Sequence, residues 1–180
     1  MLKNMQKEKC LVVGLGNIGM NFDFDLDNTG FVLTHCAAIK QHDDFILLGG
    51  VDPSSACRSD FEKKYMSPAF SNIDDALNSL NPTVGVICNP TDDHYSVLVR
   101  MLESPDLKVI LCEKPLSYNF NEAQEMVEIC AKKGVYLYVN YMRRADPNVI
   151  EIKRRIDCGE ISGPIKISAW YSKGILNNGS

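Results

Sequence analysis

The feature that most restricts the possible folds of this chain is an alternation of short apolar runs with helical patterns. Runs rich in Val, Ile and Leu read as buried strands at 9–14, 45–51, 84–88, 109–112 and 135–139. Strands that are apolar along nearly their whole length have both faces covered, which is typical of parallel pairing with helices on each side. The sequence therefore predicts an α/β fold with a doubly wound parallel sheet, the Rossmann arrangement.

The segments between these runs carry helix-period patterns or turn signals. Helices are expected over 17–20, 31–39, 55–65, 73–80, 93–102 and 121–133. Acidic residues, Asn and Gly interrupt the first helical region at 21–30, and residues 68–70 read as a short link. In a doubly wound sheet, ligands bind beyond the carboxyl ends of the strands. The polar motifs that follow the apolar runs are therefore the candidates for a site.

The composition of the 180-residue chain excludes several classes of protein. Hydrophobic residues make up 45% and charged residues 23%, as in globular proteins that are neither disordered nor fibrous. The net charge of −4 argues against a nucleic-acid or anionic-membrane surface, and the basic cluster 153–155 reads as a solvated helix face. No apolar run has the length of a signal peptide or a membrane span, so we expect a cytoplasmic protein.

The seven cysteines are scattered, with no CxxC pair and no His at metal-ligand spacing. Some of them lie within apolar runs, where a thiol behaves as a small hydrophobic group. We therefore expect no disulfide framework and no metal site.

The first apolar run ends in a glycine motif, Gly14 to Gly19. In such a motif Gly14 permits the tight turn, Gly16 lets the backbone approach a pyrophosphate, and Gly19 lets the helix pack on the strand. Free N–H groups at Gly16, Asn17 and Ile18, together with the helix dipole, would favour phosphate. A tight turn without a ligand is the alternative.

Asp52 ends the second apolar run, where the acid that binds an adenosine ribose belongs. It lies further from the glycines than the usual spacing of about 20 residues, and the interruption at 21–30 accounts for the excess. A carboxylate there accepts ribose hydroxyls and repels a 2′-phosphate, so we expect NAD in preference to NADP. Arg58 could instead bind a phosphate, lie on the adenine or remain on the surface.

The run Asp23, Asp25, Asp27 imitates the start of a calcium loop. An EF-hand would also need a glycine at Asn28 and a glutamate at Thr34, and both are missing. We interpret the run as an exposed acidic loop that borders the substrate, because it leaves the sheet next to the glycine motif.

The third apolar run is followed by Asn89, Pro90 and Thr91. The backbone of this segment can line a cofactor, and Thr91 can offer its hydroxyl. His94 could bind the cofactor or a carbonyl group, or it could cap the helix and pack. The sequence leaves both roles open.

The fourth apolar run is followed by Glu113 and Lys114. A lysine that enters an apolar cleft can lose its proton more readily or orient a substrate hydroxyl. An ordinary exposed lysine is the alternative.

Other polar residues are less informative. Asn140, Arg143 and Arg144 follow the last apolar run, where they could reach a carboxamide or a substrate anion, although at least one arginine could form a surface ion pair. His35 and His42 read as structural, because one lies in a helical pattern and the other in a loop with two aspartates.

The pattern changes after residue 145. An amphipathic helix is expected over 147–158, and residues 165–171 alternate as a half-exposed antiparallel strand would. A lone strand is not stable without partners. We therefore expect a dinucleotide-binding domain at 1–145 and, at 146–180, the incomplete start of a C-terminal substrate domain built on a sheet. The exposed strand predicts self-association.

These motifs, in this order, resemble the glucose–fructose oxidoreductase, inositol dehydrogenase and MocA family of NAD(P)-dependent oxidoreductases. The quoted landmarks are GLGNIG, VDP, NPTDDH, CEKPLS, NYMRRADP and GEISGPIKI. The resemblance implies that Lys114 is the active-site lysine. It also implies cofactor contacts from a set of residues at the strand ends: Gly14, Gly16, Asn17, Ile18, Gly19, Asp52, Asn89, Pro90, Thr91, His94, Glu113, Lys114, Asn140 and Arg143.

In that family the chain continues into an open antiparallel sheet with an Asp/His pair that completes proton transfer. Residues 176–180 resemble the approach to that pair, so the resemblance implies a fragment that is inactive by itself. The implied reaction is oxidation of a sugar or cyclitol hydroxyl by NAD, in a homo-oligomer assembled through the C-terminal sheet. A non-catalytic dinucleotide-binding regulator is the alternative.

Overall fold

The computed structural model describes residues 7–26 and 32–168. The chain separates into two compact units, Met1–Tyr141 and Met142–Ser180. The boundary expected from the sequence, after residue 145, falls slightly later in the chain. The two units are described separately below.

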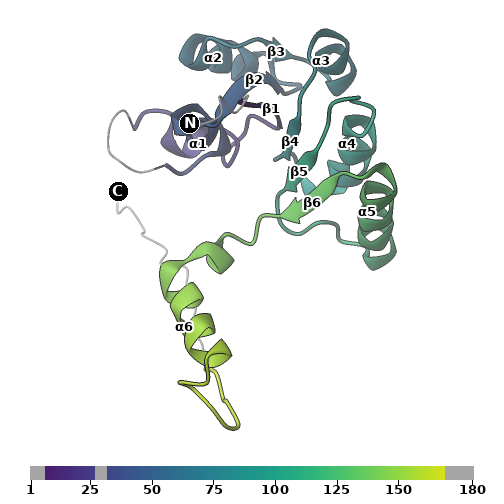
Figure 1. Ribbon diagram of the computed structural model, residues 1–180. Helices are drawn as coiled ribbons and strands as arrows, with labels where there is room; N and C mark the ends of the chain where they lie inside the picture. The colour runs from purple at the N-terminus through teal and green to yellow at the C-terminus, as the bar shows by residue number, and fades with distance from the viewer. Residues whose placement is uncertain (1–6, 27–31, 169–180) are drawn as a thin grey trace, which may run out of the picture. The chain divides into compact units, whose positions relative to one another are not determined.

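The first unit is built on a six-stranded sheet in the order β3-β2-β1-β4-β5-β6, and every pair of neighbours is parallel (Figure 1). The strands are β1 (Glu8–Val13), β2 (Phe45–Val51), β3 (Ala69–Phe70), β4 (Val84–Ile87), β5 (Val109–Cys112) and β6 (Tyr136–Val139). The doubly wound parallel sheet expected from the sequence is therefore confirmed. The expected link at 68–70 is wrong in part, because residues 69 and 70 pair with the end of β2.

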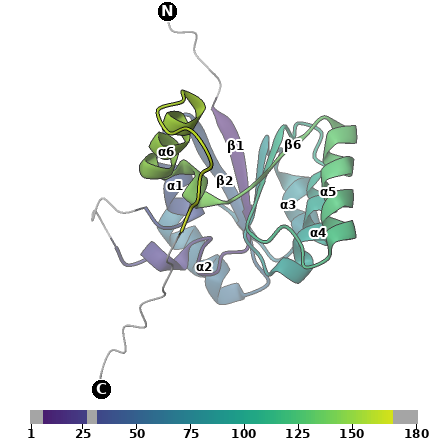
Figure 2. The same cartoon turned by 90° about the horizontal axis from the view of Figure 1, so that it is seen from below.

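Helices cover both faces of this sheet. They are α1 (His35–Gln41), α2 (Ser55–Tyr65), α3 (Ile73–Ser79), α4 (His94–Met101) and α5 (Phe120–Lys133). One apolar cluster contains Cys10 and Val12 of β1 with buried residues of α1 and α2. The other contains Leu11 and Val13 of the same strand with buried residues of α3, α4 and α5. The alternation along β1 thus places two helices on one face and three on the other, as Figure 2 shows.

Side-chain caps fix where several helices begin. Ser54, Asn72 and Asn119 accept hydrogen bonds from backbone N–H groups in the first turns of α2, α3 and α5. Such caps satisfy donors that have no partner within the helix. Gly134 ends α5 in the left-handed conformation, with φ of 70°. α2 and α3 thus begin a few residues beyond the ends of β2 and β3, which brings these strand ends and helix starts to the same edge of the sheet.

The first helical region differs from the expectation. Residues 17–20 form a turn, the short 3₁₀ helix η1 (Asn21–Asp23) follows, and α1 begins only at His35. Val32 and Leu33, expected in the helix, precede its cap at Thr34. The expectation of a helix opening at Asn17 is therefore wrong. The amide of Met20 bonds the carbonyl of Gly16, but those of Asn21 and Phe22 reach back five residues, which is not α-helical geometry.

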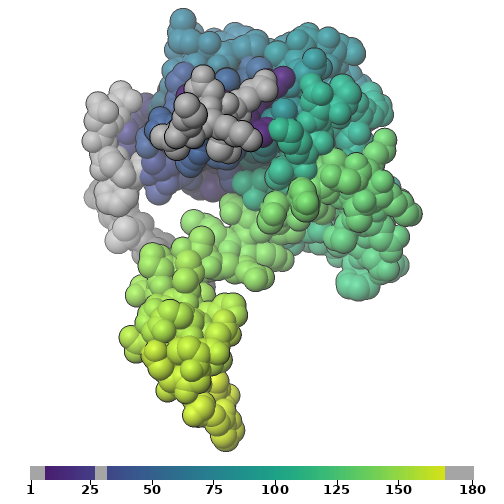
Figure 3. Space-filling view, viewed as in Figure 1, coloured from purple at the N-terminus to yellow at the C-terminus, as the bar shows by residue number. Residues whose placement is uncertain are grey.

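β6 is an edge strand of the sheet. Its residues Tyr136 and Tyr138 pair with Val109 and Leu111 of β5, and their side chains are 69% and 58% exposed. Figure 3 shows the residues of β6 and α5 in green at the border of the first unit. The order of the strands thus makes β6 one edge of the sheet and β3 the other.

The second unit contains the 3₁₀ turn η3 (Met142–Ala145) and α6 (Pro147–Asp157). Asp146 caps α6, and Glu151 pairs with Arg154 and Arg155 along its exposed side. The strand expected at 165–171 does not form over 165–168, and residues 169–171 lie outside the described residues. None of the described helices has the length and apolar character needed to cross a membrane.

Candidate functional site

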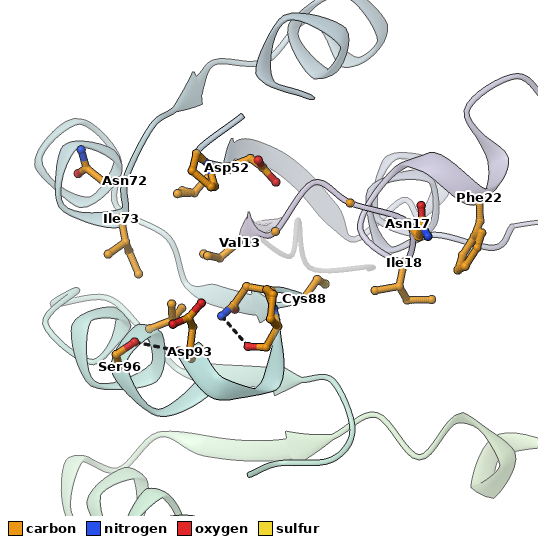
Figure 4. Close-up of a pocket in the computed structure, with 17 residues that line it drawn as sticks. Val13, Asn17, Ile18, Phe22, Asp52, Asn72, Ile73, Cys88, Asp93 and Ser96 are labelled. Atoms are coloured by element: carbon orange, nitrogen blue, oxygen red, sulfur yellow. Dashed lines mark hydrogen bonds between the residues drawn. The ribbon is translucent and has the colours of Figure 1, made fainter. Parts of the chain in front are cut away.

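A cleft with a volume of about 650 Å³ lies in the first unit, at the carboxyl ends of β1, β2 and β4. Parallel strands place these ends at one edge, so three segments far apart in sequence meet there. Figure 4 shows Asp52, Asn72 and Ile73 on one side of the cleft and Asn17 and Ile18 on the other. Predicted site residues that line it are Gly14, Gly16, Asn17, Ile18, Asp52, Asn89 and Pro90.

The three glycines of the motif have different roles. Gly14 has a φ of +94°, and a Cβ atom there would lie 2.5 Å from the backbone nitrogen of Asn89. A Cβ atom on Gly19 would collide with the carbonyl of Gly14. At Gly16 a Cβ atom would meet nothing within 4 Å, because that position opens on the cleft. Gly14 and Gly19 therefore permit the turn itself, while Gly16 leaves space for a ligand.

The turn carries hydrogen-bond donors that nothing in the described chain satisfies. The N–H groups of Gly16, Asn17 and Ile18 have no acceptor among residues 7–26 and 32–168. The first N–H groups of α1, from His35 and Cys36, donate instead to the carbonyls of Ile18 and Gly19, at 3.1 and 3.0 Å. The helix expected to open at Asn17 does not form, and α1 begins only at His35. The free donors belong to the turn.

Asp52 connects the end of β2 to the glycine turn. Its Oδ2 accepts the N–H of Leu15 at 2.8 Å, and its Oδ1 accepts the N–H of Ser54 at 2.8 Å. A carboxylate has about four acceptor positions, so two remain for a ligand on the cleft side. Arg58 donates to the carbonyls of Asp52 and Pro53, both at 2.8 Å, and its guanidinium is held at this end of the cleft.

The segment after β4 contributes one unusual atom. The side-chain oxygen of Asn89 is buried and has no hydrogen-bond partner in the described structure, while its amide group donates to the carbonyl of Pro90 at 3.2 Å. A buried acceptor without a donor is costly, by about 1–3 kcal/mol, unless a ligand or water satisfies it. Thr91 begins the 3₁₀ turn η2 (Thr91–Asp93) and does not line the cleft.

His94 is buried, and its ring contacts backbone carbonyl groups, which combines the packing and the carbonyl binding that the sequence left open. The side chain is 1% exposed and does not line the cleft. Its Nε2 lies 3.0 Å from the carbonyl oxygen of Asn89, and its Nδ1 lies 3.1 and 3.2 Å from those of Pro115 and Leu116. The ring therefore joins the segment after β4 to the segment after β5, and the assignment of His94 to the cofactor stays a prediction.

Lys114 follows β5 at the same edge of the sheet and is exposed. Beside it, the side chain of Glu113 accepts hydrogen bonds from His35 at 2.8 Å and from Asn140 at 2.6 Å. Burial raises the pKa of Glu113, but the hydrogen bonds from His35 and Asn140 outweigh it, so the pKa is lowered from its ordinary value. Glu113 and Asn140, predicted to contact the cofactor, thus contact each other. His35 belongs to this cluster, a position that its helical pattern did not indicate.

The acidic run differs from the expected exposed loop. Asp23 is 4% exposed and accepts hydrogen bonds from the backbone of Leu33 and Thr34 and from the hydroxyl of Thr34, at 2.6–3.0 Å. Burial raises the pKa of Asp23, but these hydrogen bonds outweigh it and lower the pKa below its ordinary value. Lys64 of α2 donates to the backbone carbonyls of Asp23 and Phe24. Asp25 is exposed as expected, whereas Asp27 lies outside the described residues.

Sequence reasoning missed several residues of the cleft wall. They are Phe22, Pro53, Asn72, Ile73, Cys88, Asp93, Ser96 and Val97. Most lie near strand ends or in the first turns of the helices that follow β3 and β4. Their position at the carboxyl edge was the available signal, since helix starts face a ligand there as strand ends do. Arg143 lies in the second unit, and its assignment to the cofactor stays a prediction.

No group of three or more potential metal ligands occurs among residues 7–26 and 32–168. All seven cysteines are free. Burial raises the pKa of the Cys10 and Cys112 thiols to about 12, so these thiols are not reactive.

Comparison with known proteins agrees with this geometry. Residues 8–141 match the oxidoreductase family with an NAD-binding Rossmann fold. The myo-inositol 2-dehydrogenase of Thermotoga maritima is 27% identical over 154 residues, which cover 85% of this chain and 42% of that protein. The scyllo-inositol 2-dehydrogenase (NAD(+)) of Bacillus subtilis is 39% identical over 93 residues, 52% of this chain and 25% of that protein.

Solved structures show the same fold. The WlbA dehydrogenase of Bordetella pertussis, in complex with NADH and UDP-GlcNAcA, has a TM-score of 0.73 at 24% sequence identity. The match covers 86% of this chain and 43% of that chain. The myo-inositol 2-dehydrogenase of Lactobacillus plantarum has a TM-score of 0.71 at 19% identity, covering 87% and 42%. The chain thus spans less than half the length of these relatives. With its parallel sheet, glycine turn and family match, the chain belongs to the glucose–fructose oxidoreductase, inositol dehydrogenase and MocA family of oxidoreductases, whose Rossmann fold binds NAD.

Proposed function

We propose that this chain holds NAD in the cleft as part of an oxidoreductase that transfers a hydride between a sugar or cyclitol hydroxyl and the nicotinamide. One observation carries the proposal. The free N–H groups of Gly16, Asn17 and Ile18 lie in the same cleft as the carboxylate of Asp52. The N–H groups suit a pyrophosphate, and the carboxylate suits ribose hydroxyls.

Two further observations fit a dinucleotide. The open position at Gly16 lets a phosphate approach the backbone, and the buried oxygen of Asn89 offers an acceptor for a donor group of the ligand. Because the Asp52 carboxylate would bind the adenosine ribose, this half of the dinucleotide would lie on the Asp52 side of the cleft. The opposite side, where Ile18 and Phe22 lie in Figure 4, is left for the nicotinamide.

The charge at Asp52 supports NAD in preference to NADP. A 2′-phosphate beside this carboxylate would be repelled by a few kcal/mol at contact distance, on the order of the Coulomb energy near a protein surface. Arg58 is the neighbouring cation, and its two hydrogen bonds to the carbonyls of Asp52 and Pro53 direct it to the backbone. The cation thus helps to fix the loop that carries the carboxylate.

Lys114 is the residue that we assign to the chemistry. Bound NAD would supply the hydride acceptor. The ammonium group of Lys114, at the end of the strand next to β4, would bind the reacting hydroxyl oxygen and stabilise the negative charge that develops on it. The substrate class follows from the relatives, which are named for inositols and, in one solved complex, for a nucleotide sugar.

The test is a comparison of NAD and NADP binding by the wild-type chain and by Asp52→Asn, measured calorimetrically. Asn keeps the shape of the side chain and removes the charge. We expect NAD to bind roughly tenfold more weakly, because a charged hydrogen bond contributes about 1.5–3 kcal/mol, and we expect the preference over NADP to narrow. Asp60→Asn, an exposed residue of α2, is the matched control and should leave both affinities unchanged.

An unchanged NAD:NADP preference in Asp52→Asn would remove this residue from the ribose site, and no NAD binding by the wild-type chain would contradict the proposal. An activity assay on the natural protein distinguishes the enzyme from the non-catalytic regulator. Formation of NADH from NAD in the presence of an inositol supports the enzyme, whereas NAD binding without turnover of any cyclitol or sugar supports the regulator.

A further inference from the structure

Three side chains from distant parts of the sequence meet beside Lys114. His35 is the first residue of α1, Glu113 follows β5, and Asn140 follows β6. The Nε2 atom of His35 lies 2.8 Å from Oε1 of Glu113, and Nδ2 of Asn140 lies 2.6 Å from the same oxygen. The side chains of His35 and Glu113 are only 13% and 11% exposed. The contact is therefore largely removed from solvent. A hydrogen bond to a charged group is stronger in such a place than in water.

The hydrogen-bond partners define the roles within this cluster. Oε1 of Glu113 faces two donors, and its Oε2 accepts the backbone N–H of Lys114 at 3.3 Å. The lowered pKa of Glu113 favours its ionised form, which can only accept hydrogen bonds. The contact with His35 therefore requires a proton on Nε2 of the imidazole ring. One carboxylate therefore holds His35, Asn140 and the backbone of Lys114.

His35 also contacts the glycine turn through its main chain. Its N–H donates to the carbonyl of Ile18 at 3.1 Å, and the next N–H, of Cys36, donates to the carbonyl of Gly19 at 3.0 Å. A single residue thus bonds the turn with its backbone and the neighbour of the lysine with its side chain.

The lysine itself has little to hold it. Lys114 is exposed, and within the described chain its Nζ has no hydrogen-bond partner. Its position is set by its backbone, and the side chain that bonds this backbone is Glu113. Without the His35 contact, Asn140 would be the only side chain that bonds the Glu113 carboxylate. The segment that carries Lys114 would then be less restrained.

We propose that His35 is a positioning residue, which acts through Glu113 to fix Lys114 relative to the glycine turn. The inference rests on the proposed function, because it assigns His35 to the same site. It makes a specific demand on the chemistry: the side chain of His35 must donate a hydrogen bond, and its charge and aromatic ring are not needed.

The experiment compares His35→Ala, His35→Gln and the control His42→Ala in the natural protein, with kcat, the KM for NAD, the NAD dissociation constant and the melting temperature measured for each. His42 lies just after α1 and is exposed. We expect His35→Ala to lower kcat by roughly tenfold or more, since small displacements of a catalytic group have effects of this size. NAD affinity should change by less than about threefold, because the backbone bonds to the turn remain.

His35→Gln, whose amide can donate to Glu113, should restore most of kcat, and His42→Ala should match the wild type. The inference is overturned by a wild-type kcat in His35→Ala, by no recovery in His35→Gln, or by a loss of NAD affinity that equals the loss of kcat. A loss of kcat that only follows a lower melting temperature, equal in both His35 variants, would also overturn it.

A second measurement separates this inference from the proposed function. The rate at which an amine-acylating reagent labels Lys114, relative to the exposed Lys132 of α5, can be read by mass spectrometry without NAD or turnover. We expect His35→Ala to change this ratio and His35→Gln to keep it. If the wild type binds no NAD but the ratio changes as expected, the proposed function fails and the positioning stands. An unchanged ratio in His35→Ala overturns the positioning, whether or not NAD binds.

Discussion

The two ends of the candidate site are held together in different ways. The glycine turn is fixed mainly by backbone: Gly14 and Gly19 touch main-chain atoms, and the carbonyls of Ile18 and Gly19 accept N–H groups of α1. The lysine end is fixed by side chains, which come from three segments and meet at Glu113. Backbone contacts tolerate almost no change at Gly14 and Gly19, whereas side-chain contacts can be lost one at a time. The comparison predicts a graded series of effects.

The largest effect is expected for Gly14→Ala. The position has a φ of +94°, and a Cβ atom there would lie 2.5–2.8 Å from backbone atoms of Cys88 and Asn89, so β1 and β4 would have to separate. We expect the free energy of unfolding, measured in urea, to fall by about 3–5 kcal/mol. Gly134→Ala is the control, because Gly134 also has a positive φ but nothing within 4 Å, and its loss should be only about 1–2 kcal/mol. Equal losses would show that φ alone, without the overlap, decides the cost.

A smaller effect is expected for Glu113→Ala at the lysine end. The substitution leaves the donors of His35 and Asn140 without their acceptor, so we expect a loss of about 2 kcal/mol at neutral pH. The folded-state pKa of Glu113 is lowered, so its ionised form stabilises the fold above the ordinary glutamate pKa. That contribution is lost as the pH falls through the folded-state value.

The difference between wild type and Glu113→Ala in urea unfolding should therefore shrink in acid. Glu128→Ala, an exposed residue of α5, should show no comparable loss at any pH. A difference that is independent of pH would mean that the carboxylate charge does not contribute, and the side-chain account of this end would be wrong.

The smallest effect on stability is expected for Gly16→Ala, within the same motif as Gly14. A methyl group there meets no atom of the chain within 4 Å and faces the cleft. Stability should change by less than about 0.5 kcal/mol, as for substitutions away from packed features, while NAD affinity should fall roughly tenfold or more as the methyl group occupies the phosphate approach. Unchanged NAD binding, measured calorimetrically, would place the pyrophosphate elsewhere.

The same contrast explains what could be predicted from the sequence. The parallel sheet, the glycine turn and the position of Asp52 at a strand end were predictable because their signals are local: apolar runs of strand length and a motif directly after a strand. The two-residue strand β3 was not, because residues 69 and 70 have no pattern of their own and pair only because β2 lies beside them.

The lysine end was predicted residue by residue but not as a cluster. Glu113 and Asn140 were assigned to a cofactor, and His35 was read as structural, because no local pattern indicates that positions 35, 113 and 140 meet. Asp23 was misread for a similar reason. An aspartate in an acidic run is normally solvated, and only the return of the chain at Leu33 and Thr34 buries it.

The burial of Asp23 has a consequence for how this chain can be altered. Its carboxylate bonds residues 33 and 34, while Lys64 bonds the carbonyls of Asp23 and Phe24, so the described residues on either side of 27–31 are fixed to each other and to α2. The entropy of closing such a loop grows only with the logarithm of its length, and each doubling adds about 0.6 kcal/mol. A peptide tag or a reporter domain inserted within 27–31 would therefore add little strain to the sheet. Positions 27–31 are therefore suitable for inserting a further peptide or domain.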